Sequence, residues 1–163
     1  MQHSSNAPSL ALLLLRLALG TMWISHALLK VMVFTLPGTV KFFESVGLPG
    51  VFVYPVVLAE FAGGVLILLG WHGRFASMLL SPILLVAAWV HWPNGWVFTA
   101  PNGGWEYPVF LLAVSLVHAA MGDGGVALRR SHVPIPACGR LPTFHEGPMK
   151  VYYAPAYSPQ AGH

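Results

Sequence analysis

Charged side chains are scarce in this sequence. Aspartate, glutamate, lysine and arginine together make up 8% of the 163 residues, whereas hydrophobic residues make up 56%. Soluble globular domains usually carry about 25% charged residues, so this scarcity argues against a soluble protein. The net charge of +3 is also too small for the basic surface that nucleic-acid binding requires. The composition predicts an integral membrane protein with no nucleic-acid partner.

Cysteine is also nearly absent. The one cysteine, Cys138, excludes an intramolecular disulfide framework and a Cys-x-x-Cys redox pair. His26, His91 and Glu106 are conceivable metal ligands, but no short ligand spacing supports a metal site, and we predict none. The sequence thus shows no redox centre of its own.

Long apolar runs dominate the rest of the sequence. They cover roughly residues 9–34, 51–70, 75–92 and 106–122. Because a membrane-spanning helix needs about 20 residues, with a range of about 17–25, we predict an all-α integral membrane protein. A four-transmembrane-helix bundle would occupy residues 9–122, after an N-terminal tail of residues 1–8. Residues 123–163 contain six prolines and no helical period, which predicts an irregular, proline-rich C-terminal extension.

Basic residues near the ends of these segments indicate the orientation. Arg74, Arg129 and Arg130 fall on one side of the predicted bundle, whereas Lys30 and Lys41 fall on the other. Cytoplasmic loops of membrane proteins carry an excess of lysine and arginine. The arginine-rich side is therefore predicted to be cytoplasmic, which places both termini in the cytoplasm.

The first apolar segment contains ionisable side chains in the stretch RLALGTMWISHALLK, residues 16–30. At about 100° per residue, one stripe of this helix comprises Arg16, Gly20, Trp23, Ala27 and Lys30. A charge at the bilayer centre costs about 2.5–3.5 kcal/mol on insertion scales. We therefore expect the stripe to face other helices, where its charges find partners or line a wet cavity.

Glu60 is the expected partner of Arg16. Counted from the cytoplasmic end at about 1.5 Å per residue, Arg16 lies roughly 10 Å and Glu60 roughly 15 Å into the membrane, a difference that an arginine side chain spans. Gly63 and Gly64 would let the two helices approach closely. The predicted Arg16–Glu60 ion pair either locks the bundle or forms a proton or ligand site.

The same counting places His26 and His91 at a common depth, with Lys30 and Glu106 just beyond them. Two polar layers follow: an inner one of Arg16 and Glu60, with His118 as a further candidate, and an outer one of His26, Lys30, His91 and Glu106. The outer layer would lie beneath the loop HWPNGWVFTAPNGGWEY. In that loop, Trp96 and Trp105 suit either an aromatic belt at the headgroup level or the wall of a ligand entrance.

A quinone headgroup fits the chemistry of the outer layer. His26 and Lys30 would hydrogen-bond its carbonyls, and His91 or Glu106 would relay protons, because histidine titrates in the useful range. In this hypothesis Trp96 and Trp105 line the cofactor site. Two histidines on different helices could instead ligate a haem, which we disfavour. A helix-packing role stays open for each histidine.

Several segments resemble those of the DoxX family of small four-helix membrane proteins. They are RLALGTMWISHALLK, KFFESVGLPG, AEFAGGVLILLG followed by Arg74, WEYP and MGDGG, and they span about residues 12–128. Ala27 stands where the family usually has a glycine, and ALRR replaces its usual serine-leucine-aspartate ending. The resemblance implies the four-helix fold and carries over as site candidates Arg16, His26, Lys30, Glu60, Arg74 and Glu106.

The resemblance also implies an activity. DoxX-like and DoxD-like proteins are associated with membrane oxidoreductases, including thiosulfate:quinone oxidoreductase. We therefore expect a small subunit of a quinone-linked oxidoreductase or respiratory assembly in the bacterial inner membrane, with electrons supplied by a protein partner or a bound cofactor. The alternative is a non-catalytic assembly subunit that docks on a larger complex through its helices and C-terminal extension. The apolar gap between the two predicted layers argues against a small-solute permeation protein.

Overall fold

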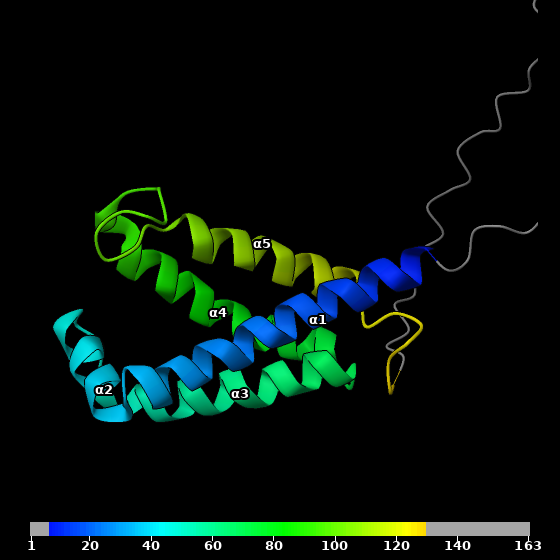
Figure 1. Ribbon diagram of the computed structural model, residues 1–163, viewed down its shortest axis with the longest axis horizontal. Coiled ribbons are helices and arrows are strands. Elements are labelled where there is room, and N and C mark those ends of the chain that lie inside the picture. Colours follow the sequence, from blue (N-terminus) through cyan, green and yellow to red (C-terminus); the bar gives the residue numbers. More distant parts are fainter. Residues whose placement is uncertain (1–6, 130–163) are drawn as a thin grey trace, which may run out of the picture. The chain divides into compact units, whose positions relative to one another are not determined.

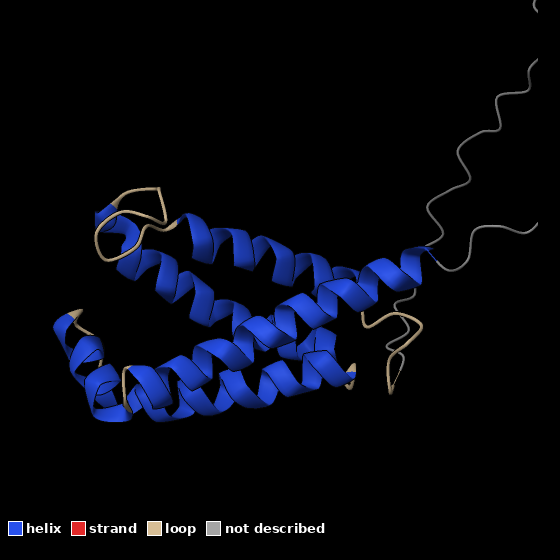
Figure 2. Ribbon diagram, in the orientation of Figure 1, coloured by secondary structure: helices blue, strands red, loops and turns tan. Residues whose placement is uncertain are grey.

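The computed structural model describes residues 7–129, which are helical with no β-strand (Figure 2). The helices are α1 (Ala7–Leu28), which continues as a π-helix (Leu29–Val33), α2 (Leu36–Ser45), α3 (Val53–Leu69), α4 (Gly73–His91) and α5 (Glu106–Met121). Short 3-10 turns, Gly50–Phe52 and Trp92–Asn94, precede α3 and follow α4. The predicted all-α fold is confirmed for this part of the chain. The N-terminal residues 1–6 and most of the predicted extension, residues 130–163, lie outside it.

Three helical stretches are long and apolar enough to cross a membrane. They are Ser9–Val33, Gly50–Leu69 and Gly73–Asn94, and they coincide with the first three predicted spans. Helix α5 has 16 residues and falls just below the usual range of about 17–25 residues. The chain is a membrane protein, and the count of four spans stays a prediction.

The helices form two pairs. Helix α1 packs along α3, α4 packs along α5, and contacts between α3 and α4 join the pairs. Figure 1 shows the pairs close together at the end where α3 turns into α4, which we call the hairpin end. They diverge toward the end where α2 and the loop 92–105 lie, which we call the loop end (Figure 1).

Two glycines set the crossing of α1 and α3. A Cβ added at Gly20 would lie 2.8 Å from the carbonyl oxygen of Gly64, and one added at Gly64 would lie 3.0 Å from that of Gly20. Small residues allow such close approach of helix backbones in membranes. This crossing places Arg16 opposite Ile67 and thereby determines which side chains of the two helices can meet.

The apolar core lies where the two pairs meet. Its buried members include Leu19 and Trp23 of α1, Ile67 of α3, Leu80 of α4 and Leu111 of α5. Other large apolar side chains point outward, among them Leu58, Leu79 and Phe110, which are 69%, 74% and 66% exposed. An outer surface of this kind suits contact with lipid, because lipid chains are as apolar as leucine.

The loop 92–105 is folded on itself at the loop end. The Trp105 ring stacks on Trp92 with centroids 4.6 Å apart and meets Trp96 edge-on at 4.3 Å. The Asn94 side chain donates to the carbonyls of Asn102 and Gly103 at 3.2 and 2.8 Å. These bonds make the loop a fixed cap over the ends of α4 and α5.

The first residues after α5 pack against the hairpin end. The backbone N–H groups of Leu128 and Arg129 donate to the carbonyls of Leu69 and Gly70, each at 3.2 Å. Residues 123–129 of the predicted extension therefore cover the C-terminal end of α3. The predicted docking role of the extension rests on residues beyond the described part of the chain.

Candidate functional site

Lys30 and Glu60 form an ion pair inside the bundle near the loop end. The Nζ of Lys30 lies 2.8 Å from both carboxylate oxygens of Glu60, and the two side chains are 18% and 3% exposed. A buried carboxylate needs an opposite charge to stay ionised, and Lys30 supplies it. Because an ammonium has three N–H donors, the two bonds to Glu60 leave one donor for a further acceptor.

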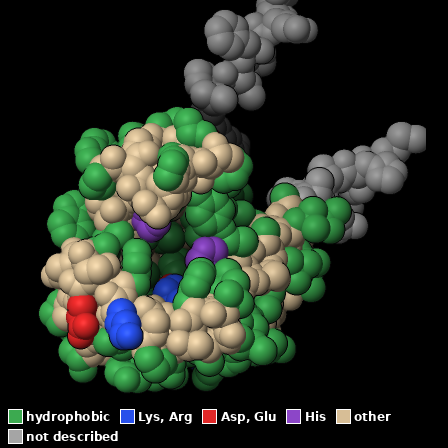
Figure 3. All heavy atoms as spheres, turned by 60° about the vertical axis from the view of Figure 1, so that its left-hand side comes forward, with side chains coloured by type: hydrophobic (Ala, Val, Ile, Leu, Met, Phe, Trp, Pro, Cys, Tyr) green, Lys and Arg blue, Asp and Glu red, His purple; other side chains and the backbone are tan. Residues whose placement is uncertain are grey.

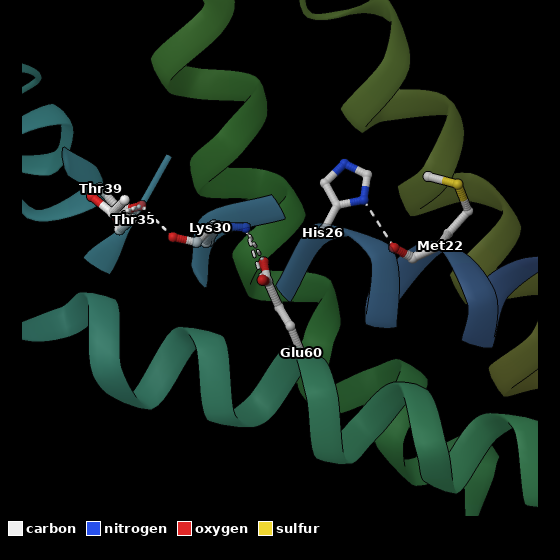
Figure 4. Close-up of polar contacts among 6 residues, drawn as sticks. All are labelled: Met22, His26, Lys30, Thr35, Thr39 and Glu60. Carbon is white, nitrogen blue, oxygen red and sulfur yellow. Dashed lines mark hydrogen bonds and ion pairs between the residues drawn. The ribbon is translucent and has the colours of Figure 1, made fainter. Parts of the chain in front are cut away.

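The π-helix at the end of α1 carries Lys30. The N–H of Phe34 donates to the carbonyl of Leu29 at 2.9 Å, the five-residue spacing of a π-turn. The hydroxyl of Thr39, on α2, lies 3.2 Å from the carbonyl of Lys30 and 2.9 Å from that of Thr35 (Figure 4). Because these bonds tie the wider turn to α2, the backbone of Lys30 is held in place.

His26 lies one turn before Lys30 on α1, and its ring points away from α3 (Figure 4). Its Nδ1 donates to the carbonyl of Met22 at 2.9 Å, since a carbonyl can only accept. The ring stacks on Tyr107 of α5, with centroids 5.8 Å apart and planes at 14°. The Tyr107 hydroxyl donates to the sulfur of Met22 at 3.2 Å. These contacts leave Nε2 of His26 without a hydrogen bond to any of residues 7–129.

His91 ends α4 beneath the loop. Its Nδ1 donates to the carbonyl of Ala87 at 2.8 Å, and a Cβ added at Gly103 would lie 3.4 Å from its ring. Its Nε2, like that of His26, has no hydrogen bond to the residues that the structure describes. Within this part of the chain, the two histidines make no direct contact with each other.

Glu106 and the two loop tryptophans serve the loop itself. The Glu106 carboxylate accepts from the backbone N–H of Phe98 at 3.2 Å, and the Glu106 N–H donates to the carbonyl of Trp96 at 3.0 Å. Trp105 is held between its two tryptophan neighbours, as described above. The structure therefore places Glu106, Trp96 and Trp105 in the cap, without a hydrogen bond to His26 or Lys30.

The loop end is hollowed between the two helix pairs. Figure 3 shows histidine side chains on both sides of this hollow and a basic side chain in its depth. Of the described histidines, His26 near the end of α1 and His91 at the end of α4 belong to the loop end, and the half-buried Lys30 follows His26 by one turn. Histidine side chains and a basic side chain thus border one hollow that is open to the outside (Figure 3).

The predicted ion pair between Arg16 and Glu60 is wrong. Arg16, which is 2% exposed, donates instead to the backbone carbonyls of Ile67, Leu68 and Asp123 at 3.0, 2.7 and 3.0 Å. The last carbonyls of a helix lack intrahelical partners, and the helix dipole is negative there. Arg16 therefore caps the C-terminal end of α3.

The helix crossing explains this exchange of partners. Arg16 lies opposite Ile67. Glu60 precedes Ile67 by seven residues on α3, so it lies about 10 Å nearer the loop end at 1.5 Å per residue. At that height Glu60 faces the π-helix that follows α1, where Lys30 reaches it. Glu60 thus belongs to the loop-end layer and not to the inner layer in which we expected it.

The inner layer also contains Asp123, which the sequence analysis missed. His118 of α5 and Asp123 are both 0% exposed, and Nε2 of His118 lies 3.5 Å from Oδ1 of Asp123. Nδ1 of His118 lies 2.8 Å from the hydroxyl of Ser77 on α4. A Cβ at Gly73 would collide with Oδ1 of Asp123. The signal for Asp123 was the segment MGDGG, which was noted only as part of a resemblance.

Comparison with known proteins places the chain in a family. The family model described as DoxX matches residues 11–92. A protein of Bacillus subtilis (strain 168) described as "Putative oxidoreductase CatD" is 35% identical over 121 residues, which cover 71% of this chain and 82% of that protein. This chain belongs to the DoxX family. No solved structure matches it.

The DoxX match covers part of the site. It includes both residues of the Lys30–Glu60 pair together with Arg16, His26 and His91, whereas the hairpin-end residues His118 and Asp123 lie beyond residue 92. The DoxX segment therefore contains His26, Lys30, Glu60 and His91 of the loop-end site, whereas Tyr107, Glu106 and the loop tryptophans Trp96 and Trp105 lie beyond it.

Proposed function

We propose that this DoxX protein is a small membrane subunit of a quinone-linked oxidoreductase or respiratory assembly. Its part is to hold a quinone headgroup and exchange protons with it in the hollow at the loop end. The loop end would lie near the outer leaflet of a bacterial inner membrane, with both chain termini in the cytoplasm. A protein partner or a bound cofactor would supply the electrons.

The observation that carries this proposal is the pair of unused polar atoms at the hollow. His26 keeps Nε2 available because Nδ1 is bound to Met22. Lys30 keeps one N–H donor because Glu60 takes two. A quinone has two carbonyl oxygens that accept hydrogen bonds, so one donor at each carbonyl is the arrangement that its headgroup needs.

Each residue has a defined part in the proton chemistry. Reduction of a quinone to a quinol adds two electrons and two protons. A protonated His26 donates through Nε2, and the neutral ring accepts a proton at the same atom when a quinol is oxidised. Glu60 accepts a proton when Lys30 turns its ammonium toward the headgroup. His91 is a second proton carrier at the rim, while Glu106 and the tryptophans hold the loop.

The name of the Bacillus subtilis relative supports the oxidoreductase part of the proposal, because that protein is described as an oxidoreductase. The hydrophobic setting supports the choice of a lipid-soluble partner. Three of the helices are long and apolar enough to cross a membrane, so a ligand dissolved in lipid can reach the bundle from the side.

Quinone retention tests the proposal. The protein is purified from membranes in mild detergent, and quinone per mole of protein is measured in its lipid extract by chromatography. We expect bound quinone in the wild-type protein and a clear loss in His26→Ala. His72→Ala is the matched control, because His72 precedes α4 at the hairpin end. Equal quinone content in wild type and His26→Ala would contradict the proposed site.

A further inference from the structure

A second polar cluster is buried at the hairpin end and has no part in the proposed quinone site. His118, Ser77 and Asp123 are each 0% exposed. Arg16 adjoins them through its bond to the Asp123 carbonyl at 3.0 Å. Since an imidazole can take up and release protons, this cluster is a place where a proton can reside inside the bundle.

Two buried polar atoms lie between this cluster and the loop-end site. They are Nε1 of Trp23 and the hydroxyl oxygen of Ser115, and neither has a hydrogen-bond partner within the described part of the chain. Trp23 and Ser115 are 2% and 0% exposed. Buried polar groups are hydrogen-bonded in the great majority of cases, and ordered water serves where protein atoms do not.

The spacing along the helices links these atoms to the two sites. Trp23 precedes His26 by three residues on α1, and Ser115 precedes His118 by three residues on α5. Residues three apart are neighbours on one helix face. Each orphan atom therefore belongs to a residue one turn from a histidine, one at each end of the bundle.

The contacts between α1 and α5 place both orphan atoms in the stretch of the bundle between the two sites. The helices run antiparallel. The His26–Tyr107 stack joins them near the loop end, and near the hairpin end Arg16 of α1 binds the carbonyl of Asp123, two residues after α5. Trp23 and Ser115 each lie between these two contacts on their own helix. Trp23 also packs in the same core cluster as Leu111, one turn before Ser115 on α5.

We propose that water bound between Trp23 and Ser115 connects His118 with the His26 site, so that protons cross the interior of the bundle. A hydroxyl both donates and accepts, so Ser115 can pass a proton along, whereas an indole N–H only donates and anchors the water. A proton released at one histidine is replaced by one taken up at the other. The transfer needs no oxidant or reductant.

Ionisable groups surround the histidine at each end of the proposed path. Asp123 and Arg16 adjoin His118 at the hairpin end. At the loop end, Tyr107 stacks on His26, and the Lys30–Glu60 pair lies one turn away. The opposite charges of Lys30 and Glu60 offset each other. At the hairpin end, the cation Arg16 and the carboxylate of Asp123 act on a proton at His118 in opposite directions.

Hydrogen exchange of the Trp23 indole tests the path directly. The full chain, labelled with 15N-tryptophan in lipid nanodiscs, is transferred to D2O, and the indole cross-peaks are followed by NMR. Trp23→Phe identifies the Trp23 signal among the six tryptophans. We expect the indole N–H to exchange at least about tenfold faster than the backbone N–H of Trp23, because water reaches it without opening of α1.

A serine pair provides the matched variants. Ser115→Ala removes the relay hydroxyl and should slow exchange of the Trp23 indole. Ser81→Ala is the control, because Ser81 is also buried, at 7% exposure, and its hydroxyl already donates to the carbonyl of Ser77 at 2.8 Å. The proposal fails if the indole is protected as long as the backbone N–H, or if the two variants behave alike.

This inference rests on the proposed function only in that the quinone at the His26 site would receive or supply the protons. The exchange measurement needs neither quinone nor an electron donor, so the two proposals fail separately. Fast indole exchange without quinone in the lipid extract would remove the quinone site and leave the water path. Bound quinone together with a protected Trp23 indole would remove the water path and leave the quinone site.

Discussion

The ammonium of Lys30 and the carboxylate of Glu60 bind each other across α1 and α3 through two contacts of 2.8 Å. Arg16, which lies nearer the start of α1, donates to three backbone carbonyls and caps the end of α3. The bundle therefore compensates a buried cation at each end by a different means. At the loop end the compensating group is ionisable, and at the hairpin end three of the acceptors are backbone carbonyls.

The Lys30–Glu60 pair is expected to be strongly coupled. Lys30→Met leaves the carboxylate of Glu60, 3% exposed, without its partner, and breaking a buried pair costs about 3–5 kcal/mol. We expect a loss of about 3 kcal/mol in the free energy of unfolding, at the lower end of this range because Lys30 is half-buried. The double variant Lys30→Met/Glu60→Met should recover most of it. Unfolding in detergent measures all of these variants, and additive losses would show that the two side chains do not interact.

Arg16→Lys should destabilise the protein although the charge is kept. A lysine ammonium cannot reproduce the planar fork that reaches three carbonyls, and hydrogen bonds to charged groups contribute about 1.5–3 kcal/mol each. We expect a loss of about 2 kcal/mol in the free energy of unfolding. Arg129→Lys, at an exposed position, is the control. Combination with Glu60→Gln should give additive effects, and a coupling between the two would restore the ion pair that the structure excludes.

Thr39→Val tests whether α2 holds Lys30 in place. Valine keeps the shape of the side chain but removes the hydroxyl that lies near the carbonyls of Lys30 and Thr35. We expect a loss of about 1 kcal/mol in stability and lower quinone retention in the lipid extract. Thr99→Val, in the exposed part of the loop, should change neither. Wild-type retention in Thr39→Val would show that the π-turn positions Lys30 without α2.

Periodicity predicted which side chains of α1 face the interior. Gly20, Trp23 and Ala27 are buried as the stripe required, Arg16 is 2% exposed, and Lys30 is half-buried. This prediction succeeds because the face of a straight helix depends only on local spacing. The same spacing could not foresee the π-helix at Leu29–Val33, since a π-turn reflects the contacts of that segment with α2.

Depth counting succeeded only in part. It placed His26, Lys30 and His91 at one end of the bundle, as the structure does. It failed for Glu60 because it assumed that both helices begin at one flat plane. The close approach at Gly20 and Gly64 offsets α3 along α1, and that offset moves Glu60 away from Arg16 by about two turns.

The amino-acid sequence alone determined that the chain resides in a membrane, that its long apolar segments are helices, and that their ionisable residues face inward. These properties follow from composition and local period, because lipid excludes unpaired charges and unbonded backbone. Only the tertiary structure decided that Glu60 binds Lys30, that Arg16 caps α3, and that Asp123 joins His118. Such partnerships depend on where helices that are distant in the sequence cross. One close contact between two backbones fixes the offset between the helices, and that offset decides which side chains face each other along their whole length.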